Sequence, residues 1–388
     1  MLEKITVNQK EAAEKIADTG EYQEKNKLQQ NFIENEIGDF SSENAREHVE
    51  EIKRIFSEHF SSLGYLEHPS VAISSGIDPT VRFIGSHISV FKPYILEKSV
   101  PNPGYFMSQD CIRARNLKHL LDDNFLPKWG SYFPSLGTIS PPDHLHKVCE
   151  EVFALFADKL KIKDDDIRIL INSSDTDLLD AIPERFNRNH LEIDTHEEKY
   201  YRHKFGIDGV WGRNFNIAIR DKGTDKFSDV ANIIMIETED EKLGIEFALG
   251  ATTTLKQLYV LDHVADCHPV PTISTLEHEL KYKFEDAVIV STMLTKEGLQ
   301  PLSTNNRGRI LRSYMRSLSY FRAKAGMSIE ELQIALLKFE DQQFPDTEKM
   351  SAKEIINYVI YYEKELTDKK YTTYEDKTIL EAIGNMNK

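Results

Sequence analysis

The hydrophobic pattern changes its period once along the chain, and this change limits the folds that the chain can adopt. Up to about residue 254, apolar runs of strand length alternate with turns that contain Gly, Pro and Asp. After Thr254 the apolar residues recur every three to four positions, as in successive amphipathic helices. We therefore expect an α+β first part followed by an α-helical second part, with the boundary near Cys267–Pro271.

The individual elements follow from the same periodicities. Apolar residues at helical spacing from Ala45 to Leu63, followed by Gly64 as a C-cap, predict the first long helix. Apolar runs between turn residues predict strands at Val71–Ser74, Thr80–Ile84, Tyr105–Ser108, Ile167–Ile171, Asn214–Arg220, Asn232–Ile236 and Gly244–Leu249. Further helices are predicted at His144–Leu160, Leu255–Val264, Leu276–Leu294, Arg309–Lys324, Ile329–Leu337 and Ala352–Leu366.

The length of 388 residues allows two or three domains, at roughly 150 residues each. We divide the chain into an acidic extension (1–44), an α+β domain (45–268) and a helical domain (269–388). The extension is polar with scattered apolar residues, which is typical of a solvated helical arm or a partly disordered segment. Its charge makes it a candidate surface for a protein partner.

Several classes of protein are disfavoured by what the chain lacks. Its apolar stretches are shorter than the roughly 18 residues of a membrane span, and the N-terminal residues contain no apolar signal segment. The cysteines Cys111, Cys149 and Cys267 are odd in number and far apart, which fits reduced thiols in the cytoplasm. The clusters around His146 and His268 lack a second group at metal-binding spacing, so we expect no protein-held metal.

The charge pattern is uneven. The formal net charge is -16, which argues against indiscriminate binding of polyanions. Yet the window 298–329 holds six cations and no acidic residue. Three of these cations, Arg309, Arg312 and Arg316, share one stripe of a predicted helix whose start is preceded by Ser-Thr-Asn-Asn. A helix N-terminus beside an arginine row suits phosphate contacts, and asparagine can read base edges. The alternative is that these arginines pair with the acidic extension or with the C-terminal helices.

A second basic feature is the run SQDCIRARN at 108–116. Arg113 and Arg115 follow a strand there and precede a turn, where a guanidinium can hold a phosphate through two hydrogen bonds. Structural ion pairing is the other explanation for an arginine at the end of a strand.

Placed in order, several runs resemble the catalytic core of the alanyl-tRNA synthetase family, which belongs to the class II aminoacyl-tRNA synthetases. The segment AREHVEEIKRIFSEHFSSLGYLEHPS resembles the opening helix of that family, and SQDCIR is similar to its Ser-Gln-x-Cys-(Val/Ile/Leu)-Arg signature. The run STNNRGRILRSYMR at 303–316 resembles the family's Ser-Asn-Glu-x-Arg-Gly-Tyr-Val-Leu-Arg-Arg run, which opens its acceptor-stem-reading domain. The resemblance covers about residues 45–370. It implies a largely antiparallel sheet with flanking helices, followed by a helical tRNA-binding domain.

The resemblance also implies roles for individual residues. Arg113 would hold the α-phosphate of ATP, which arrives with Mg²⁺, and would stabilise the transition state of adenylate formation. The other ATP-binding residues would be Lys118, Phe133 and Lys256, and those for the amino acid Glu246, Asn232, Trp211 and Gly250. The acceptor stem of tRNA would contact Asn305, Asn306, Arg307, Arg309, Arg312 and Arg316.

The chain also departs from the family pattern. Thr253 stands where the family has an arginine for the γ-phosphate, and Lys256 is the nearest cation. Pro134 stands where the family has a glutamate in an aromatic-rich strand. Asn216 stands where the family has a glutamate in its glycine-containing segment. We therefore expect an ATP-dependent ligase that activates alanine or another small amino acid and transfers it to tRNA. The alternatives are a paralogue that binds tRNA or a protein without forming an adenylate, and an adenylate-forming ligase with a non-tRNA acceptor.

Overall fold

The computed structural model describes residues 39–195, 198–221, 223–270, 276, 278–302 and 304–386. Nearly all of the acidic extension (1–44) lies outside these ranges, and so does Ser303 of the predicted helix start. The expected protein-binding role of the extension therefore concerns residues that the structure does not describe. None of the helices within the described ranges is both long and apolar enough to cross a membrane.

The described strands form one nine-stranded sheet. Its order is β1-β2-β3-β9-β8-β7-β4-β5, and β6 pairs with β7. The strands are β1 (Leu66–Glu67), β2 (Tyr105–Ile112), β3 (Tyr132–Ser140), β4 (Ile167–Asn172), β5 (Leu191–Asp194), β6 (Arg202–Lys204), β7 (Trp211–Arg220), β8 (Phe227–Glu237) and β9 (Lys242–Gly250). All neighbouring pairs are antiparallel except β1·β2 and β4·β5. The sheet is thus largely antiparallel, as expected.

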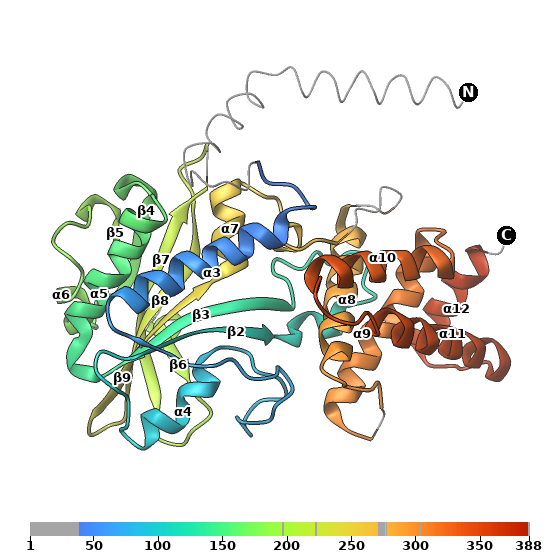
Figure 1. Ribbon diagram of the computed structural model, residues 1–388, viewed down its shortest axis with the longest axis horizontal. Helices are drawn as coiled ribbons and strands as arrows, with labels where there is room; N and C mark the ends of the chain where they lie inside the picture. Colours follow the sequence, from blue (N-terminus) through green and yellow to red (C-terminus); the bar gives the residue numbers. More distant parts are fainter. Residues whose placement is uncertain are drawn as a thin grey trace.

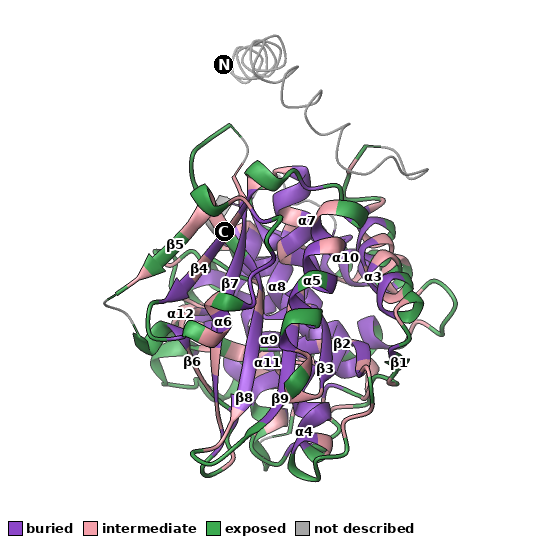
Figure 2. Ribbon diagram, turned by 90° about the vertical axis from the view of Figure 1, so that its left-hand side faces the viewer, coloured by how far each residue is buried: buried purple, intermediate pink, exposed green. Residues whose placement is uncertain are grey.

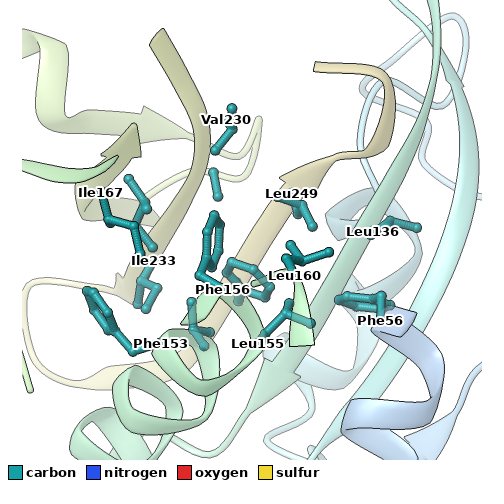
Figure 3. Packing of buried hydrophobic residues seen from close by; sticks show 14 of the residues in the cluster. Phe56, Leu136, Phe153, Leu155, Phe156, Leu160, Ile167, Val230, Ile233 and Leu249 are labelled. Atoms are coloured by element: carbon teal, nitrogen blue, oxygen red, sulfur yellow. The ribbon is translucent and has the colours of Figure 1, made fainter. Parts of the chain in front are cut away.

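The central strands send alternate side chains to opposite faces, as the period of two requires. Ile233 and Met235 of β8 join the larger hydrophobic cluster under α3 (Ala45–Ser62) and α5 (Leu145–Ala154). Figure 3 shows members of this cluster from the sheet and from both covering segments. Ile234 and Ile236 point the other way, into a smaller cluster with α4 (Ile88–Leu96). Helices therefore cover both faces, and most residues of the central strands are buried (Figure 2).

The first predicted helix is confirmed. Its buried residues lie at helical spacing, from Val49 through Ile52 and Phe56 to Phe60. The helix ends at Ser62, and Gly64 has a φ of +86°, the left-handed conformation expected just after a helix C-terminus. The strands predicted between residues 167 and 249 are confirmed as parts of β4, β7, β8 and β9.

Two predicted strands are wrong. Val71–Ser74 and Thr80–Ile84 are loops and turns, although their apolar residues are of strand type. The backbone N–H of Val71 donates to the Gln109 side chain at 2.9 Å, and those of Ile73 and Ser74 donate to the Glu297 carboxylate at 2.6 and 2.9 Å. These distant side chains satisfy backbone groups that would otherwise need a neighbouring strand.

The second part of the chain is helical, as expected. It contains α7 (Ala251–Tyr259), α8 (His278–Lys296), α9 (Asn306–Lys324), α10 (Ile329–Gln343), α11 (Ser351–Lys369) and α12 (Tyr374–Met386). Figure 1 shows α8 to α12 gathered at one end of the molecule, beyond the ends of β2 and β3. One hydrophobic cluster joins α8 to α12 with Phe83, Ile112 and Tyr132 of the preceding part. The two parts are therefore packed together, and the boundary at 268/269 remains our proposal.

Candidate active site and RNA-facing helix

Two adjoining cavities lie on the α4 side of the sheet. The smaller has a volume of about 380 Å³ and the larger of about 820 Å³. Because the odd-numbered residues 245, 247 and 249 of β9 join the cluster under α3, Glu246 and Ala248 face the cavity side. The residues that line both cavities are Ser86, Arg113, Arg115, His203, Asn232 and Ala248.

Arg113 stands where the two cavities meet. It directly follows β2, with an extended backbone, and its Nε donates to the Gly85 carbonyl at 2.6 Å. The guanidinium lies over the Phe133 ring, with Cζ 4.9 Å from the ring centroid. These two contacts leave the terminal nitrogens of Arg113 without a recorded bond within the described residues. The arrangement suits a charge-assisted contact to a phosphate in either cavity.

The wall of the larger cavity is strongly basic. It carries five cationic side chains, and Glu246 is the carboxylate among its described residues. The cations are Arg82, Lys92, Arg113, Arg115 and Lys204. One of them, Lys92, is neutralised by the buried Asp78 at 2.5 Å. The remaining positive charge favours an anionic ligand, although the chain as a whole is acidic.

Glu246 faces a buried histidine. His87, immediately before α4, places Nε2 at 3.2 Å from Oε1 of Glu246, and its Nδ1 lies 2.9 Å from the Ser135 hydroxyl. Both His87 and Glu246 are almost completely buried. Gly137 makes room for the imidazole, since a Cβ at that position would lie 1.9 Å from Nε2 of His87.

Burial determines the protonation of this pair. It raises the pKa of Glu246 to about 8, against the opposing effect of Arg113 and Lys92. It also lowers the pKa of His87 to about 3, and Arg113 acts in the same direction. Near pH 7 both groups are therefore neutral. The His87 ring is then held by the bond between Nδ1 and the Ser135 hydroxyl, and Nε2 has no recorded hydrogen bond within the described residues. To hold an ammonium group, Glu246 would have to release its proton.

Asn232 is the polar residue of β8 that reaches both cavities. Its Oδ1 is buried and has no hydrogen-bond partner within the described part of the chain. It lies opposite Asn216 of β7, whose own Oδ1 accepts a bond from Asn214 at 2.6 Å. Because an unpaired buried carbonyl oxygen is costly, Asn232 is suited to accept a bond from a ligand.

The far end of the smaller cavity is formed by the start of α7. Gly250 and Thr253 line it, and a Cβ on Gly250 would lie 3.0 Å from Oγ1 of Thr253. Tyr200 and Asp229, which are hydrogen-bonded to each other, line the same cavity. The structure therefore brings five of the predicted site residues to the two cavities: Arg113, Phe133, Asn232, Glu246 and Gly250.

Three other predicted site residues lie elsewhere. Trp211, at the start of β7, donates from Nε1 to Glu237 at 3.2 Å and lines neither cavity. Lys118 lines a third cavity, between the segment 117–124 and the helices α9 and α12. Lys256 is on α7 and lines neither the smaller nor the larger cavity.

The basic stripe is on α9, and its residues differ in their surroundings. Asn305 is the N-cap, whose Oδ1 accepts from the Gly308 N–H at 2.6 Å, so this side chain is engaged in capping the helix. Arg309 contacts Asn306, and both are exposed. Arg307 donates to the Arg82 carbonyl of the preceding part.

The remaining cations of the window are largely structural. Arg316 lies over the Tyr362 ring of α11, at 4.5 Å from its centroid. Arg322 is buried in an ion pair with Glu363 at 2.6 Å, and Lys324 pairs with Asp123 at 2.7 Å. Pairing with the C-terminal helices thus explains Arg322, while Arg309 and Arg312 have no recorded acidic partner within the described residues.

The sequence of the chain is similar to those of two alanine–tRNA ligases. Over an alignment of 363 residues, covering 82% of the chain and 40% of the relative, the sequence is 21% identical to an alanine–tRNA ligase of Acetivibrio thermocellus. An alanine–tRNA ligase of Natranaerobius thermophilus is 27% identical over 119 residues, which are 28% of the chain and 13% of that protein. The chain has a divergent alanyl-tRNA synthetase-like catalytic core.

No protein-family model matches the chain. Among solved structures, the pyrrolysyl-tRNA synthetase PylSc of Desulfitobacterium hafniense has a TM-score of 0.34 and 11% identity, over 55% of this chain and 70% of that one. The histidyl-tRNA synthetase of S. aureus has a TM-score of 0.33 and 14% identity, over 54% and 69%. The likeness to alanine–tRNA ligases rests on the sequence similarity, and the chain spans about two fifths of the length of the first relative.

This synthetase-like core contains site residues that sequence reasoning missed, and one that it noticed but that the family resemblance left without a role. His87 comes from the run GSHIS at 85–89, which has no motif spacing that would mark it. Arg115 is indicated as a phosphate ligand by the sequence but receives no role from the family resemblance, although it lines both cavities and lies over Trp129. The sequence gives no sign that His203 and Asp229 belong to the site. They reach the smaller cavity because β6 and β8 both pair with β7, which brings together residues distant in the chain.

Proposed function

We propose that the chain activates alanine or another small amino acid with ATP and transfers it to the acceptor end of tRNA. The observation that carries the proposal is the position of Arg113, stacked on Phe133 between a smaller cavity and a larger basic one. A carboxylate in one cavity and a nucleotide in the other would meet at this guanidinium. The similarity to an alanine–tRNA ligase along 82% of the chain supports the same reaction.

In the first step, the amino-acid carboxylate attacks the α-phosphorus of ATP, an acyl–phosphate bond forms and pyrophosphate leaves. Arg113 would stabilise the charge that builds up on the α-phosphate oxygens, and this task requires no nucleophilic side chain. Phe133 would stack on the adenine, and Arg115 would contact the outer phosphates. Asn232 would accept a hydrogen bond from the substrate ammonium, together with Glu246 once it is ionised.

Mg²⁺ would enter this reaction bound to ATP. The described residues contain no group of three or more His, Cys, Asp or Glu side chains arranged to hold a metal ion. Asp229 is an exposed carboxylate in the wall of the smaller cavity. We therefore expect phosphate oxygens and water to supply most of the Mg²⁺ ligands, as is usual for nucleotide-bound Mg²⁺.

In the second step, a ribose hydroxyl of the tRNA 3′ end attacks the acyl carbonyl, and AMP leaves. The exposed Asn306 and Arg309 near the N-terminus of α9, with Arg312 one turn further, would contact the acceptor stem. Arg307 would lie between the stem and the larger cavity, since it contacts Arg82, which lines that cavity. A cytoplasmic location, where the three buried free cysteines stay reduced, belongs to this proposal.

One observation favours a second candidate function, a paralogue that binds tRNA or a protein without forming an adenylate. Thr253 lines the smaller cavity where the resembled family has an arginine for the γ-phosphate, and Lys256 does not line that cavity. The lost contact would reduce transition-state stabilisation by about 3 kcal/mol, which slows adenylation without abolishing it. We therefore rank the ligase first.

ATP–pyrophosphate exchange with a panel of small amino acids tests the ligase directly. Arg113→Gln removes the cation but keeps a polar side chain of similar length, so the exchange kcat should fall by about 100-fold or more. Arg54→Gln is the matched control, because Arg54 is exposed on α3 and its recorded partners among the described residues are Glu51 and Glu58 of the same helix. The control should exchange like the wild type. Folded protein that exchanges with none of the amino acids would rule out the ligase and favour the paralogue.

A further inference from the structure

Ser131, one residue before β3, connects Arg113 to the helical part of the chain. Its carbonyl accepts a hydrogen bond from the Arg113 N–H at 2.8 Å. Its own N–H and hydroxyl donate to the two carboxylate oxygens of Asp286, on α8, at 2.7 and 2.6 Å. The Tyr314 hydroxyl, on α9, lies 2.7 Å from the same Ser131 oxygen and can donate to it. A single residue thus bridges Arg113, α8 and α9.

The residues of this junction are shielded from solvent. Ser131 and Tyr314 are fully buried and Asp286 is 4% exposed. No ion pair of Asp286 is recorded within the described ranges, and burial raises its pKa to about 6, while bonds from Ser131 and Asn116 act in the opposite direction. A buried carboxylate without a cation is costly, so its two bonds to Ser131 hold that residue firmly.

The segment around Ser131 is also the wall of the smaller cavity. Trp129, Gly130 and Tyr132 line it, and the Trp129 carbonyl accepts a bond from the Asn116 side chain at 3.0 Å. A displacement of Ser131 would therefore move both the backbone of Arg113 and one side of the cavity. Because the guanidinium must meet a phosphate within about 0.5 Å, small displacements matter.

We propose that Asp286 and Tyr314 are positioning residues that fix Arg113 through Ser131, so that the helical part completes the nucleotide site. This inference rests on the proposed function, since it assigns a role to residues that support Arg113. On this basis α8 and α9 hold the phosphate-binding arginine in place, which for α9 is a second task besides the proposed contact with RNA.

A double-mutant cycle tests the inference in the full chain. Ser131→Ala removes the hydroxyl bonds to Asp286 and Tyr314 and should weaken ATP binding roughly fivefold by calorimetry, with a fall of roughly tenfold or more in exchange kcat. In an Arg113→Gln background the same substitution should weaken ATP binding clearly less than in the wild type, because the part of its effect that acts through Arg113 is already lost. Ser291→Ala is the matched control, since it removes a buried hydroxyl, on α8, that has no recorded partner among the residues that the structure describes.

The outcomes separate the two proposals. Equal losses from Ser131→Ala in the wild-type and Arg113→Gln backgrounds would show a general structural effect and overturn the inference. So would a loss from Ser291→Ala as large as that from Ser131→Ala. Wild-type protein that binds ATP but shows no exchange would contradict the proposed function, while the binding cycle still decides the role of Ser131. Protein that binds no ATP would contradict both.

Discussion

Glu246, which faces His87 at the predicted amino-acid site, carries a proton at neutral pH. Burial keeps Glu246 protonated up to about pH 8, whereas in the unfolded chain it ionises near its ordinary pKa of 4.5. The folded state therefore binds more protons than the unfolded state between these values, and raising the pH through this range lowers stability. His87 has the opposite tendency, because its lowered pKa costs stability only as the pH falls below about 6.5.

Glu246→Gln should remove this pH dependence. Between pH 6.5 and 8, the free energy of unfolding of the wild type should fall relative to that of Glu246→Gln, which cannot ionise. Urea unfolding at several pH values within this range measures the difference. Glu241→Gln, in the exposed turn between β8 and β9, serves as the control and should follow the wild type. A constant difference between wild type and Glu246→Gln across this range would mean that Glu246 is already ionised in the folded protein.

At the scale of elements, the periodicities predicted most of the helices and central strands but not the loops between them. Apolar runs between turn residues identified parts of β7, β8 and β9, which are apolar on both faces because their side chains are divided between two hydrophobic clusters. The apolar residues of Val71–Ser74 and Thr80–Ile84 are buried in part as well. In Val71–Ser74, however, the side chains of Gln109 and Glu297 accept from backbone N–H groups that a neighbouring strand would otherwise bond. No local pattern carries information about partners that are 38 and 224 residues away.

The same limit applies to the site. Arg113, Phe133 and Glu246 could be predicted because each belongs to a motif of the resembled family and to a strand or strand end that faces the cavities. Trp211 was placed at the site by the same resemblance, but its ring N–H is engaged by Glu237 outside the cavities. His87 could not be predicted, because its role depends on the space left by Gly137 on another strand.

The arginine stripe of α9 leads to a prediction about RNA binding. The double substitution Arg309→Gln/Arg312→Gln should weaken tRNA binding and reduce the slope of log affinity against log salt by about two, if each arginine contacts one phosphate. Filter binding at several salt concentrations measures both quantities. The exposed pair Lys338→Gln/Lys353→Gln, on α10 and α11, makes the same charge change as a control. If both double variants have the wild-type salt slope, α9 is not the contact surface.

At the scale of the whole molecule, the net charge of -16 conceals two local concentrations of positive charge. One is the wall of the larger cavity and the other is the exposed part of α9. They are connected, because Arg307 of α9 contacts the backbone of Arg82 in the cavity wall. Acidic residues elsewhere would repel RNA and restrict it to this path, so the overall charge limits where a polyanion binds.

We propose that this molecule joins a small amino acid to tRNA. The most direct measurement incubates the full chain with ATP, Mg²⁺, mixed tRNA and each small amino acid in turn. The tRNA is then digested, and aminoacyl-adenosine is detected by mass spectrometry. We predict aminoacyl-adenosine from alanine or another small amino acid with the wild type, and at least about 100-fold less with Arg113→Gln. If folded wild-type protein that binds tRNA yields no aminoacyl-adenosine with any of the amino acids, the molecule is not an aminoacyl-tRNA ligase for small amino acids.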